Sequence, residues 1–275
     1  MSEVRPDITV AATGFDVDFL GTATPLPALT EWAAADTLRV DGSEWLDYTH
    51  FSLSMSRSRR LARVVAWNID GATLKDVSRS GIPFRPDPRI PESAQFVNDL
   101  YANNDLDRGH VARRADLTWE PGAGQANRDS FYFTNITPQL NDFNQASRGG
   151  LWGRLEDDLL AEARLTEQRI SVFGGPLLTD ADPVYRDAGI PTAYWKMFVY
   201  RIDGELRLQG FLLRQNLDRL ETSAFPTEKW AMYAYSTEQL RVAAGVDFGA
   251  YTGWERARQA AVGAAEWGPL SAVEW

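Results

Sequence analysis

The side chains best suited to chemistry gather in residues 107–156. The first motif in this stretch, Asp-Arg-Gly-His, ends at His110, and the last, Trp-Gly-Arg-Leu-Glu, ends at Glu156; Asn135 and Asn144 lie between them. A histidine can take a proton from water near neutral pH, and an asparagine amide oxygen suits a Mg²⁺ ion that keeps most of its waters. Arginines grip phosphate through paired donors. Together these residue types point to metal-assisted cleavage of a phosphodiester.

An ordered series of motifs extends well beyond this stretch. The motifs are Asp-Arg-Gly-His (107–110), Thr-Asn-Ile-Thr-Pro-Gln (134–139), Asn-Gln (144–145) with Trp-x-x-Leu-Glu (152–156), Val-Phe-Gly-Gly-Pro-Leu (172–177), Ile-Pro-Thr-Ala-Tyr-Trp-Lys (190–196) and Gly-Phe-Leu-Leu-Arg-Gln-Asn (210–216). In this order they resemble the DNA/RNA non-specific endonucleases, the family that includes endonuclease G, over roughly residues 46–247. The resemblance implies an α+β protein with the ββα-metal (His-Me finger) nuclease fold, a mixed central sheet flanked by helices, and Mg²⁺-dependent hydrolysis of DNA and RNA.

The resemblance also implies a role for each residue of the stretch. His110 is expected to be the general base that deprotonates water, and Asn135 to support the site through a hydrogen bond. Asn144 is expected to bind one Mg²⁺ directly, with Mn²⁺ or another divalent cation as alternatives. Glu156 is then the carboxylate that acts through a metal-bound water. A lone histidine is more often structural than catalytic, and the company of these side chains is what favours catalysis by His110.

Nearby arginines are the candidates for binding the phosphate. Arg108 would contact the phosphate or brace the site. In the family an arginine of a loop, here the proline-rich residues 78–98, contacts the scissile phosphate. Arg79 is the first candidate and Arg85 the second, because the local register is ambiguous. The alternative for either one is a loop arginine that is solvated or paired with Asp87.

The chain departs from the family pattern between Asn144 and Glu156, where it carries four extra residues. The glycines of residues 144–150 predict a looped-out bulge that leaves Asn144 facing Glu156. In the alternative, Asn141 or the bulge itself rearranges the metal site.

A second departure lies one turn after Glu156. Related sequences often place an arginine there, and this chain has Leu160. A cation that binds phosphate or pairs with the glutamate is therefore either missing or supplied by Arg164 or Arg148.

Periodic patterns predict the elements that position these side chains. Residues 48–55 and 62–69 alternate as two strands joined by a short basic turn, and residues 130–134 predict an apolar strand that delivers the following asparagine. From Leu151, apolar residues at every fourth position predict a helix with Glu156 among apolar neighbours. Further predicted elements are strands at 170–175, 194–202 and 206–213, a helix with a capping pattern at 236–245, and a helix at 254–265.

The composition fits one large domain and excludes several kinds of site. Residues 46–275 are expected to form a single domain with a C-terminal helical tail, and residues 1–45 an extension packed on it. The absence of cysteine excludes disulfides, thiolate metal sites and cysteine nucleophiles, and two histidines are too few for a multi-histidine zinc cluster. The second histidine, His50, lies in a predicted strand and is expected to be packed or hydrogen-bonded rather than catalytic.

The formal net charge of −10 argues at first against a nucleic-acid partner. Arginines nevertheless concentrate in residues 57–63 and 108–114, which favours binding to DNA and RNA through the phosphate backbone; the alternative is a solvated charged face. The acidic total predicts weak, salt-sensitive non-specific binding. The chain has no long apolar run and no basic-then-apolar N-terminus, so a cytoplasmic protein without membrane contact is expected.

Two further functions compete with that of an active nuclease. The insertion, Leu160 and the acidic charge favour a nuclease-fold protein that binds nucleic acid or an inhibitor protein with weak or no turnover. The other alternative is a phosphoesterase that acts on small nucleotides. A homodimer through the N-terminal or C-terminal segment is an additional interaction that the sequence leaves open.

Overall fold

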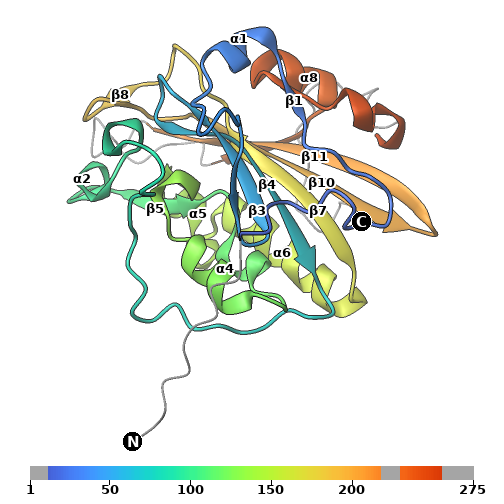
Figure 1. Ribbon diagram of the computed structural model, residues 1–275. Helices are drawn as coiled ribbons and strands as arrows, with labels where there is room; N and C mark the ends of the chain where they lie inside the picture. Colours follow the sequence, from blue (N-terminus) through green and yellow to red (C-terminus); the bar gives the residue numbers. More distant parts are fainter. Residues whose placement is uncertain (1–11, 218–229, 256–275) are drawn as a thin grey trace, which may run out of the picture.

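A seven-stranded sheet runs through the molecule (Figure 1). The computed structural model describes residues 12–217 and 230–255. In their order across the sheet the strands are β12 (Trp230–Ala234), β11 (Glu205–Gln215), β10 (Ala193–Ile202), β7 (Arg169–Pro176), β4 (Leu61–Asp70), β3 (Phe51–Ser56) and β2 (Leu46–Tyr48). Every neighbouring pair is antiparallel, so the expected mixture of parallel and antiparallel strands is not found.

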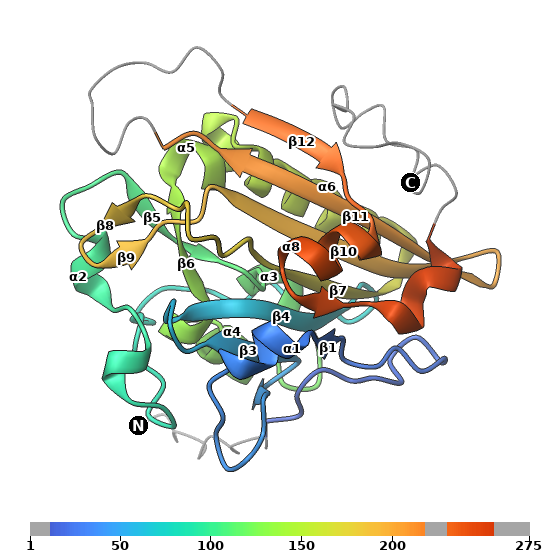
Figure 2. The ribbon, with the colours of Figure 1, turned by 90° about the horizontal axis from the view of Figure 1, so that it is seen from above.

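Both faces of this sheet are covered, which explains why its central strands are mostly apolar and buried on both sides. All residues of β4 are buried, and their side chains alternate between two hydrophobic clusters. Val65 and Trp67 belong to the cluster that holds α6, whereas Val64 and Ala66 belong to the cluster that holds α8. Figures 1 and 2 show the same layering, with α1 and α8 on one side of the sheet and α4, α5 and α6 on the other.

The face that holds α6 carries the predicted functional residues. A two-stranded ribbon of β5 and β6 lies there, followed in the chain by α5 and α6, which is the order of elements that the ββα fold requires. The apolar stripe of α6 is buried against the sheet, as its periodicity predicts. The elements are η1 (Glu92–Ala94), α2 (Asn98–Tyr101), β5 (Leu106–His110), α3 (Arg114–Leu117), α4 (Ala123–Asp129), η2 (Phe133–Asn135), β6 (Ile136–Leu140), α5 (Asn141–Asn144), η3 (Ala146–Arg148) and α6 (Leu151–Thr166).

Phe15 and Phe19, in the described part of the N-terminal segment, are buried in the cluster on the opposite face. The predicted capping pattern is present, because Ser236 and Gln239 form a capping box at the start of α8. The predicted helix at 254–265 lies almost entirely outside the described residues. Within the described residues, no helix is long and apolar enough to cross a bilayer. The remaining elements are β1 (Ala28–Leu29), α1 (Glu31–Ala35), β8 (Val184–Tyr185), β9 (Ala188–Gly189), α8 (Thr237–Ala243), β13 (Val246–Asp247) and η4 (Gly249–Trp254).

Two predictions of local structure were wrong. Residues 48–55 form two strands rather than one, because His50 adopts a positive φ of 71° in the tight turn between β2 and β3. Residues 130–134 are not a strand: their backbone turns into η2, where the Asn135 amide donates to the carbonyl oxygen of Tyr132 instead of to a neighbouring strand. Strand pairing begins only at Ile136.

Candidate active site

The β5–β6 ribbon presents the first motif on two different faces. Its register places Asp107 opposite Gln139, and His110 opposite Ile136. Alternate residues of a strand share a face, so His110 lies on the face of Arg108 and Asp107 on the other. The neighbours differ accordingly: aromatic rings lie against the first face, and amide side chains against the second.

His110 is a neutral base with a free nitrogen. Its Nε2 atom is buried and has no hydrogen-bond partner among the described residues. The rings of Phe84 and Phe131 lie 5.7 and 5.3 Å from the imidazole, measured between centroids. Burial and the charges of three arginines lower the pKa of His110 to about 3, so the ring is uncharged at neutral pH. In decreasing order of effect, these arginines are Arg79, Arg114 and Arg113.

The two loop arginines occupy different environments. The positive charge of Arg79 acts on His110, and the Arg79 side chain is exposed. The guanidinium of Arg85 instead lies 4.2 Å from the centre of the Tyr132 ring and donates to the carbonyl oxygen of Arg128 at 3.4 Å. The geometry therefore favours Arg79 over Arg85 as the arginine closer to the candidate base.

Two other arginines nearby are held in place by the fold. Arg108 Nε donates to Asn98 Oδ1 at 2.9 Å, and its guanidinium lies over the rings of Phe84 and Tyr101. Arg89 Nη2 binds Asp87 Oδ2 at 2.7 Å. Asp87 is thus paired with Arg89, and the expected alternative of pairing with a candidate loop arginine is not found.

Asn135 supports the chain immediately beyond His110. It is fully buried, its Oδ1 accepts from the amide of Ala112 at 2.9 Å, and its Nδ2 donates to the carbonyl oxygens of Ala112 and Ser130 at 3.0 and 3.1 Å. The amide group is therefore engaged with backbone rather than free to contact a substrate. These bonds join the backbone at residue 112, just beyond His110, to that at residue 130, and the supporting role stays a prediction.

Asp107 fixes the amide group of Asn144. Asp107 Oδ2 accepts from Asn144 Nδ2 at 3.0 Å and from Gln145 Nε2 at 2.7 Å. An ionised carboxylate only accepts hydrogen bonds, so it forces both amide nitrogens toward itself. The Oδ1 atom of Asn144 is the atom left to bind a cation.

Gln139 lies opposite Asp107 on the same face of the ribbon. It is fully buried, and neither atom of its amide group has a hydrogen-bond partner in the described part of the chain. Its side chain crosses Gly109, where a Cβ atom would stand 2.0 Å from Gln139 Oε1. A side chain at position 109 would therefore displace Gln139, which accounts for glycine as the third residue of the first motif.

These oxygens fit a hydrated divalent cation better than a cluster of charged ligands. Residues 12–217 and 230–255 contain no group of three or more His, Cys, Asp or Glu that could hold a metal. Mg²⁺ commonly binds through one or two protein oxygens and keeps several waters. Asn144 Oδ1 could supply the direct ligand, and the unpartnered Gln139 amide could bind a coordinated water. Among the described contacts, no hydrogen bond joins Asn144 to His110.

The extra residues between Asn144 and Glu156 form a closed loop, as predicted. They include η3, and the amide of Gly150 donates to the carbonyl oxygen of Gln145 at 3.0 Å. The backbone of α6 then returns to Asn144, because a Cβ atom on Gly153 would lie only 2.5 Å from the Asn144 carbonyl oxygen. Glu156 follows Gly153 by three residues and so lies on the same face of the helix.

Glu156 is a buried carboxylate with two unlike oxygens. Its Oε1 accepts from Lys196 Nζ at 2.5 Å, and Lys196 is fully buried. Its Oε2 lies 3.8 Å from Arg113 Nε, beyond hydrogen-bond distance. Arg113 also contributes to lowering the pKa of His110, so it links the surroundings of the two candidate catalytic groups.

The expected sources of a cation near Glu156 were wrong. Arg164 Nη2 binds Asp76 at 2.8 Å, and Arg148 Nη1 donates to Asn141 Oδ1 at 3.3 Å. The sequence did contain a signal for the correct partner, because Lys196 ends the motif at 190–196 as a charged residue among the apolar residues of a strand.

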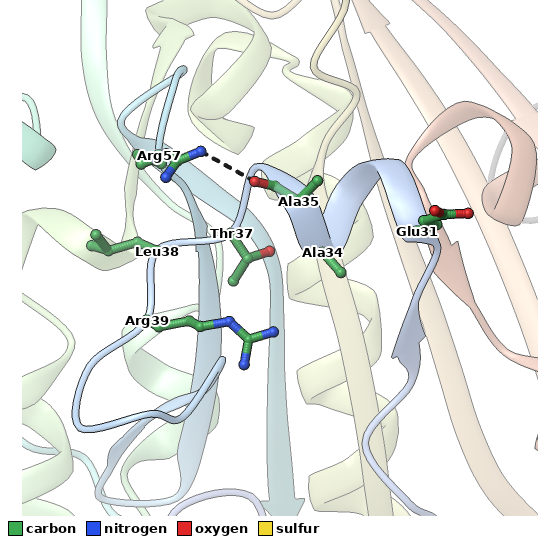
Figure 3. Close-up of a pocket in the computed structure, with 7 residues that line it drawn as sticks. All are labelled: Glu31, Ala34, Ala35, Thr37, Leu38, Arg39 and Arg57. Carbon is green, nitrogen blue, oxygen red and sulfur yellow. Dashed lines mark hydrogen bonds between the residues drawn. The ribbon is translucent and has the colours of Figure 1, made fainter.

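Two arginines of the other predicted basic segment, residues 57–63, are paired within the fold. Arg59 binds Asp182 at 2.6 Å, and the buried Arg63 binds Asp36 at 2.9 Å. Arg57 borders a surface cavity of about 650 Å³ beside α1 that contains none of the candidate site residues (Figure 3). Its lining consists of Glu31, Ala34, Ala35, Thr37, Leu38, Arg39 and Arg57.

Comparison with known proteins identifies the family of this chain. Residues 33–253 match the family model described as DNA/RNA non-specific endonuclease. An uncharacterised protein of Sinorhizobium fredii is 36% identical over 217 residues, which cover 74% of this chain and 32% of that protein. A nuclease of Nostoc is 26% identical over 204 residues, covering 72% and 70% of the two chains.

Animal proteins and a solved structure are also similar. The mitochondrial nuclease EXOG of Danio rerio is 32% identical over 159 residues, covering 57% of this chain and 43% of that protein. The chain therefore spans well under two thirds of the length of some of these relatives. A structure of an EndoG/EndoGI complex matches with a TM-score of 0.58 and 21% identity over 75% of this chain and 85% of that one. At that identity the match supports the fold.

Proposed function

This chain belongs to the DNA/RNA non-specific endonuclease family, and we propose on that basis that it is a divalent-cation-dependent endonuclease that hydrolyses phosphodiester bonds in DNA and RNA. The observation that carries the proposal is the state of His110. A neutral imidazole whose buried Nε2 lacks a partner among the described residues has an unmet capacity for a hydrogen bond. A buried polar atom without a partner costs free energy, and a substrate or water would satisfy it.

His110 becomes a better base when the substrate is bound. In the free protein its pKa is held low by burial and by the charges of Arg79, Arg114 and Arg113. The phosphodiester brings a negative charge that offsets these arginines, so the pKa of His110 rises toward the range in which a general base is most effective. His110 then takes the proton of the attacking water, while Arg79 and Arg108 bind the non-bridging oxygens.

Asn144, oriented by Asp107, would hold the divalent cation, and Glu156 would act on it through a coordinated water. The cation would supply positive charge near the scissile phosphate, as Mg²⁺ or, alternatively, Mn²⁺. Asp107 keeps the Asn144 oxygen directed away from itself, and Asn135 holds the backbone that follows His110. These residues preorganise the site before the substrate arrives.

The substrate class follows from the type of contact. Arginine side chains bind phosphate groups, which carry no base sequence, so the proposed enzyme has low sequence selectivity. The acidic net charge of −10 makes binding weak and dependent on salt. An inhibitor protein is a proposed partner, since the similar EndoG structure is a complex with EndoGI.

Digestion of polymeric and small substrates tests the proposal. Duplex DNA, single-stranded DNA, RNA and bis(p-nitrophenyl) phosphate are incubated with the protein, with Mg²⁺ or with EDTA. The expected result is Mg²⁺-dependent cleavage of all three polymers that EDTA abolishes. Hydrolysis of the small diester alone would show a phosphoesterase, and binding of nucleic acid without cleavage would show a non-catalytic protein; either result overturns the proposal.

A further inference from the structure

A fully buried lysine lies beside the candidate site with no role in the mechanism above. Lys196 extends from β10, in the interior of the sheet, and its Nζ donates to Glu156 Oε1 at 2.5 Å. The ammonium lies 4.1 Å from the centre of the Trp152 ring and 5.3 Å from that of Trp67. Burying a cation is costly unless it is paired, so the structure must gain something from this arrangement.

A second carboxylate accompanies this ion pair. Asp116 is fully buried and accepts from Trp67 Nε1 at 3.1 Å through Oδ2, while its Oδ1 has no hydrogen-bond partner among the described residues. Asp116 and Glu156 both favour the charged form of Lys196, whose pKa burial lowers. Burial has the opposite effect on an acid, and it raises the pKa of Asp116 to about 6. Both carboxylates oppose the lowering of the Lys196 pKa by burial, and Glu156 does so through a direct hydrogen bond.

The pairing makes the two oxygens of Glu156 different. Oε1 is fixed by Lys196, whereas Oε2 has no hydrogen bond among the described residues and lies 3.8 Å from Arg113 Nε. Without Lys196, rotation about the last bond of the side chain would exchange the two oxygens. With it, one oxygen is anchored to the sheet and the other is available on the side of Arg113.

We propose that Lys196 is the positioning residue for Glu156: it anchors Oε1 and leaves Oε2 directed to the reaction centre. This inference rests on the proposed nuclease function, in which Glu156 acts on the cation through a water. It also explains how α6 functions with Leu160 one turn after Glu156. The cation comes from a strand 40 residues further along the chain instead of from the same helix.

The side chains around Lys196 predict different results for two substitutions. Lys196→Met has a similar length and no charge, so Glu156 loses its anchor, which is its one side-chain hydrogen bond among the described residues. Lys196→Arg keeps the charge and can donate to Oε1, but the planar guanidinium is bulkier than the ammonium that fits between Trp67 and Trp152. We therefore expect partial activity from Lys196→Arg and much less from Lys196→Met.

A double-mutant cycle with Glu156→Gln tests the proposal. Single-turnover cleavage of a duplex and Mg²⁺ binding by calorimetry are measured for wild type, Lys196→Met, Glu156→Gln and the double variant. Lys196→Met is expected to lower the cleavage rate about 10- to 100-fold, with little change in KM, and to weaken Mg²⁺ binding. In the Glu156→Gln background the same substitution should change either quantity by less than about threefold, because residues acting as a unit are not additive.

A lysine outside the site provides the control for this cycle. Lys75→Met removes an exposed lysine outside the site and should leave both quantities unchanged. Equal effects of Lys196→Met in both backgrounds would show a structural role only, as would a loss that Lys196→Arg does not recover at all. Thermal unfolding shows whether each variant folds. If Lys196→Met does not fold, Lys196→Arg takes its place in the double-mutant cycle with Glu156→Gln. A wild-type protein without metal-dependent cleavage would overturn the proposed function, and this inference with it.

Discussion

His50 and His110 both lie against aromatic rings, yet their ring nitrogens are in opposite situations. His50 Nδ1 is 2.8 Å from the carbonyl oxygen of Leu117, its Nε2 is 2.9 Å from that of Pro121, and its ring stacks on Trp119 at 3.5 Å. His110 Nε2 is buried without a partner in the described chain. Both His50 nitrogens face backbone carbonyl oxygens, so neither is open to a substrate, whereas the buried Nε2 of His110 has an unmet capacity for a hydrogen bond. The number of free nitrogens, rather than burial, separates the structural histidine from the candidate base.

Replacing each histidine with alanine tests whether the two differ in function, and it has the largest expected effect. His110→Ala should lower the cleavage rate by about 10²- to 10⁴-fold, the usual contribution of a general base, with a small change in thermal stability. His50→Ala should do the reverse: it loses a ring hydrogen bond to a backbone carbonyl and a stacked ring, and the free energy of unfolding should fall by about 1–3 kcal/mol. Single-turnover cleavage and urea unfolding measure the two effects.

A His110→Ala protein with undiminished metal-dependent cleavage would remove the distinction. So would a His50→Ala protein that folds with wild-type stability but no longer cleaves. His110→Asn serves as the second variant, since it keeps a polar side chain in the buried position.

Variants of the two loop arginines test whether a positive charge near His110 contributes to cleavage. Arg79→Gln should lower kcat/KM by about 10- to 100-fold, because it removes a charge-assisted bond to phosphate. Arg85→Gln removes the same charge from a side chain that stacks on Tyr132, and should change kcat/KM by less than about threefold. Equal losses from the two variants would contradict the assignment of Arg79.

Asp107→Asn tests whether the amide side chains on the other face of β5 need an acceptor-only partner. An asparagine at this position can face Asn144 with either its oxygen or its nitrogen, so the Asn144 oxygen is no longer forced outward. Mg²⁺ affinity, measured by calorimetry, should fall about tenfold, as for other outer-shell partners of metal ligands. Asp105→Asn is the matched control, because in the described part of the chain the Asp105 carboxylate bonds only to the Asn141 side chain, at 3.4 Å; an equal effect of both variants would exclude a specific role for Asp107.

Stability against pH gives the smallest and most specific effect. The pKa of His110 is about 3 in the folded protein and ordinarily 6.5, so between these values the unfolded chain binds a proton that the folded chain does not. Stability should therefore fall as pH decreases from 6.5 toward 3, by up to about 1.4 kcal/mol per pH unit from this group. His110→Ala should have a shallower decline over the same window in urea unfolding; an unchanged slope would mean that His110 has an ordinary pKa.

The sequence predicted much of this architecture because the information was local or motif-based. Period-two and period-four patterns predicted most strands of the sheet and α6, and the spacing of glycines predicted the loop before α6. The turn at His50 and the η2 turn were missed because tertiary contacts decide them. The alternation within residues 48–55 continues through His50, which the structure places at positive φ, so the pattern alone does not show the turn.

The candidate site was predicted by residue type but not by pairing. The motifs identified His110, Asn144 and Glu156, whereas the partners of these side chains come from distant parts of the chain. Lys196 reaches Glu156 from β10, and the expected helix arginines bind elsewhere. A side chain's ion-pair partner depends on how the sheet and helix pack, which periodicity within either element does not encode.

The protonation state of His110 and its response to a bound oligonucleotide can be measured separately from those of His50. Because the chain has only two histidines, NMR of their ring carbons and nitrogens resolves each one without ambiguity. We predict that His110 is neutral from pH 5 to 8, that its pKa rises when a non-hydrolysable oligonucleotide binds, and that the His50 signals do not respond. A His110 that titrates near 6.5 and ignores the oligonucleotide, or a response confined to His50, would contradict the account.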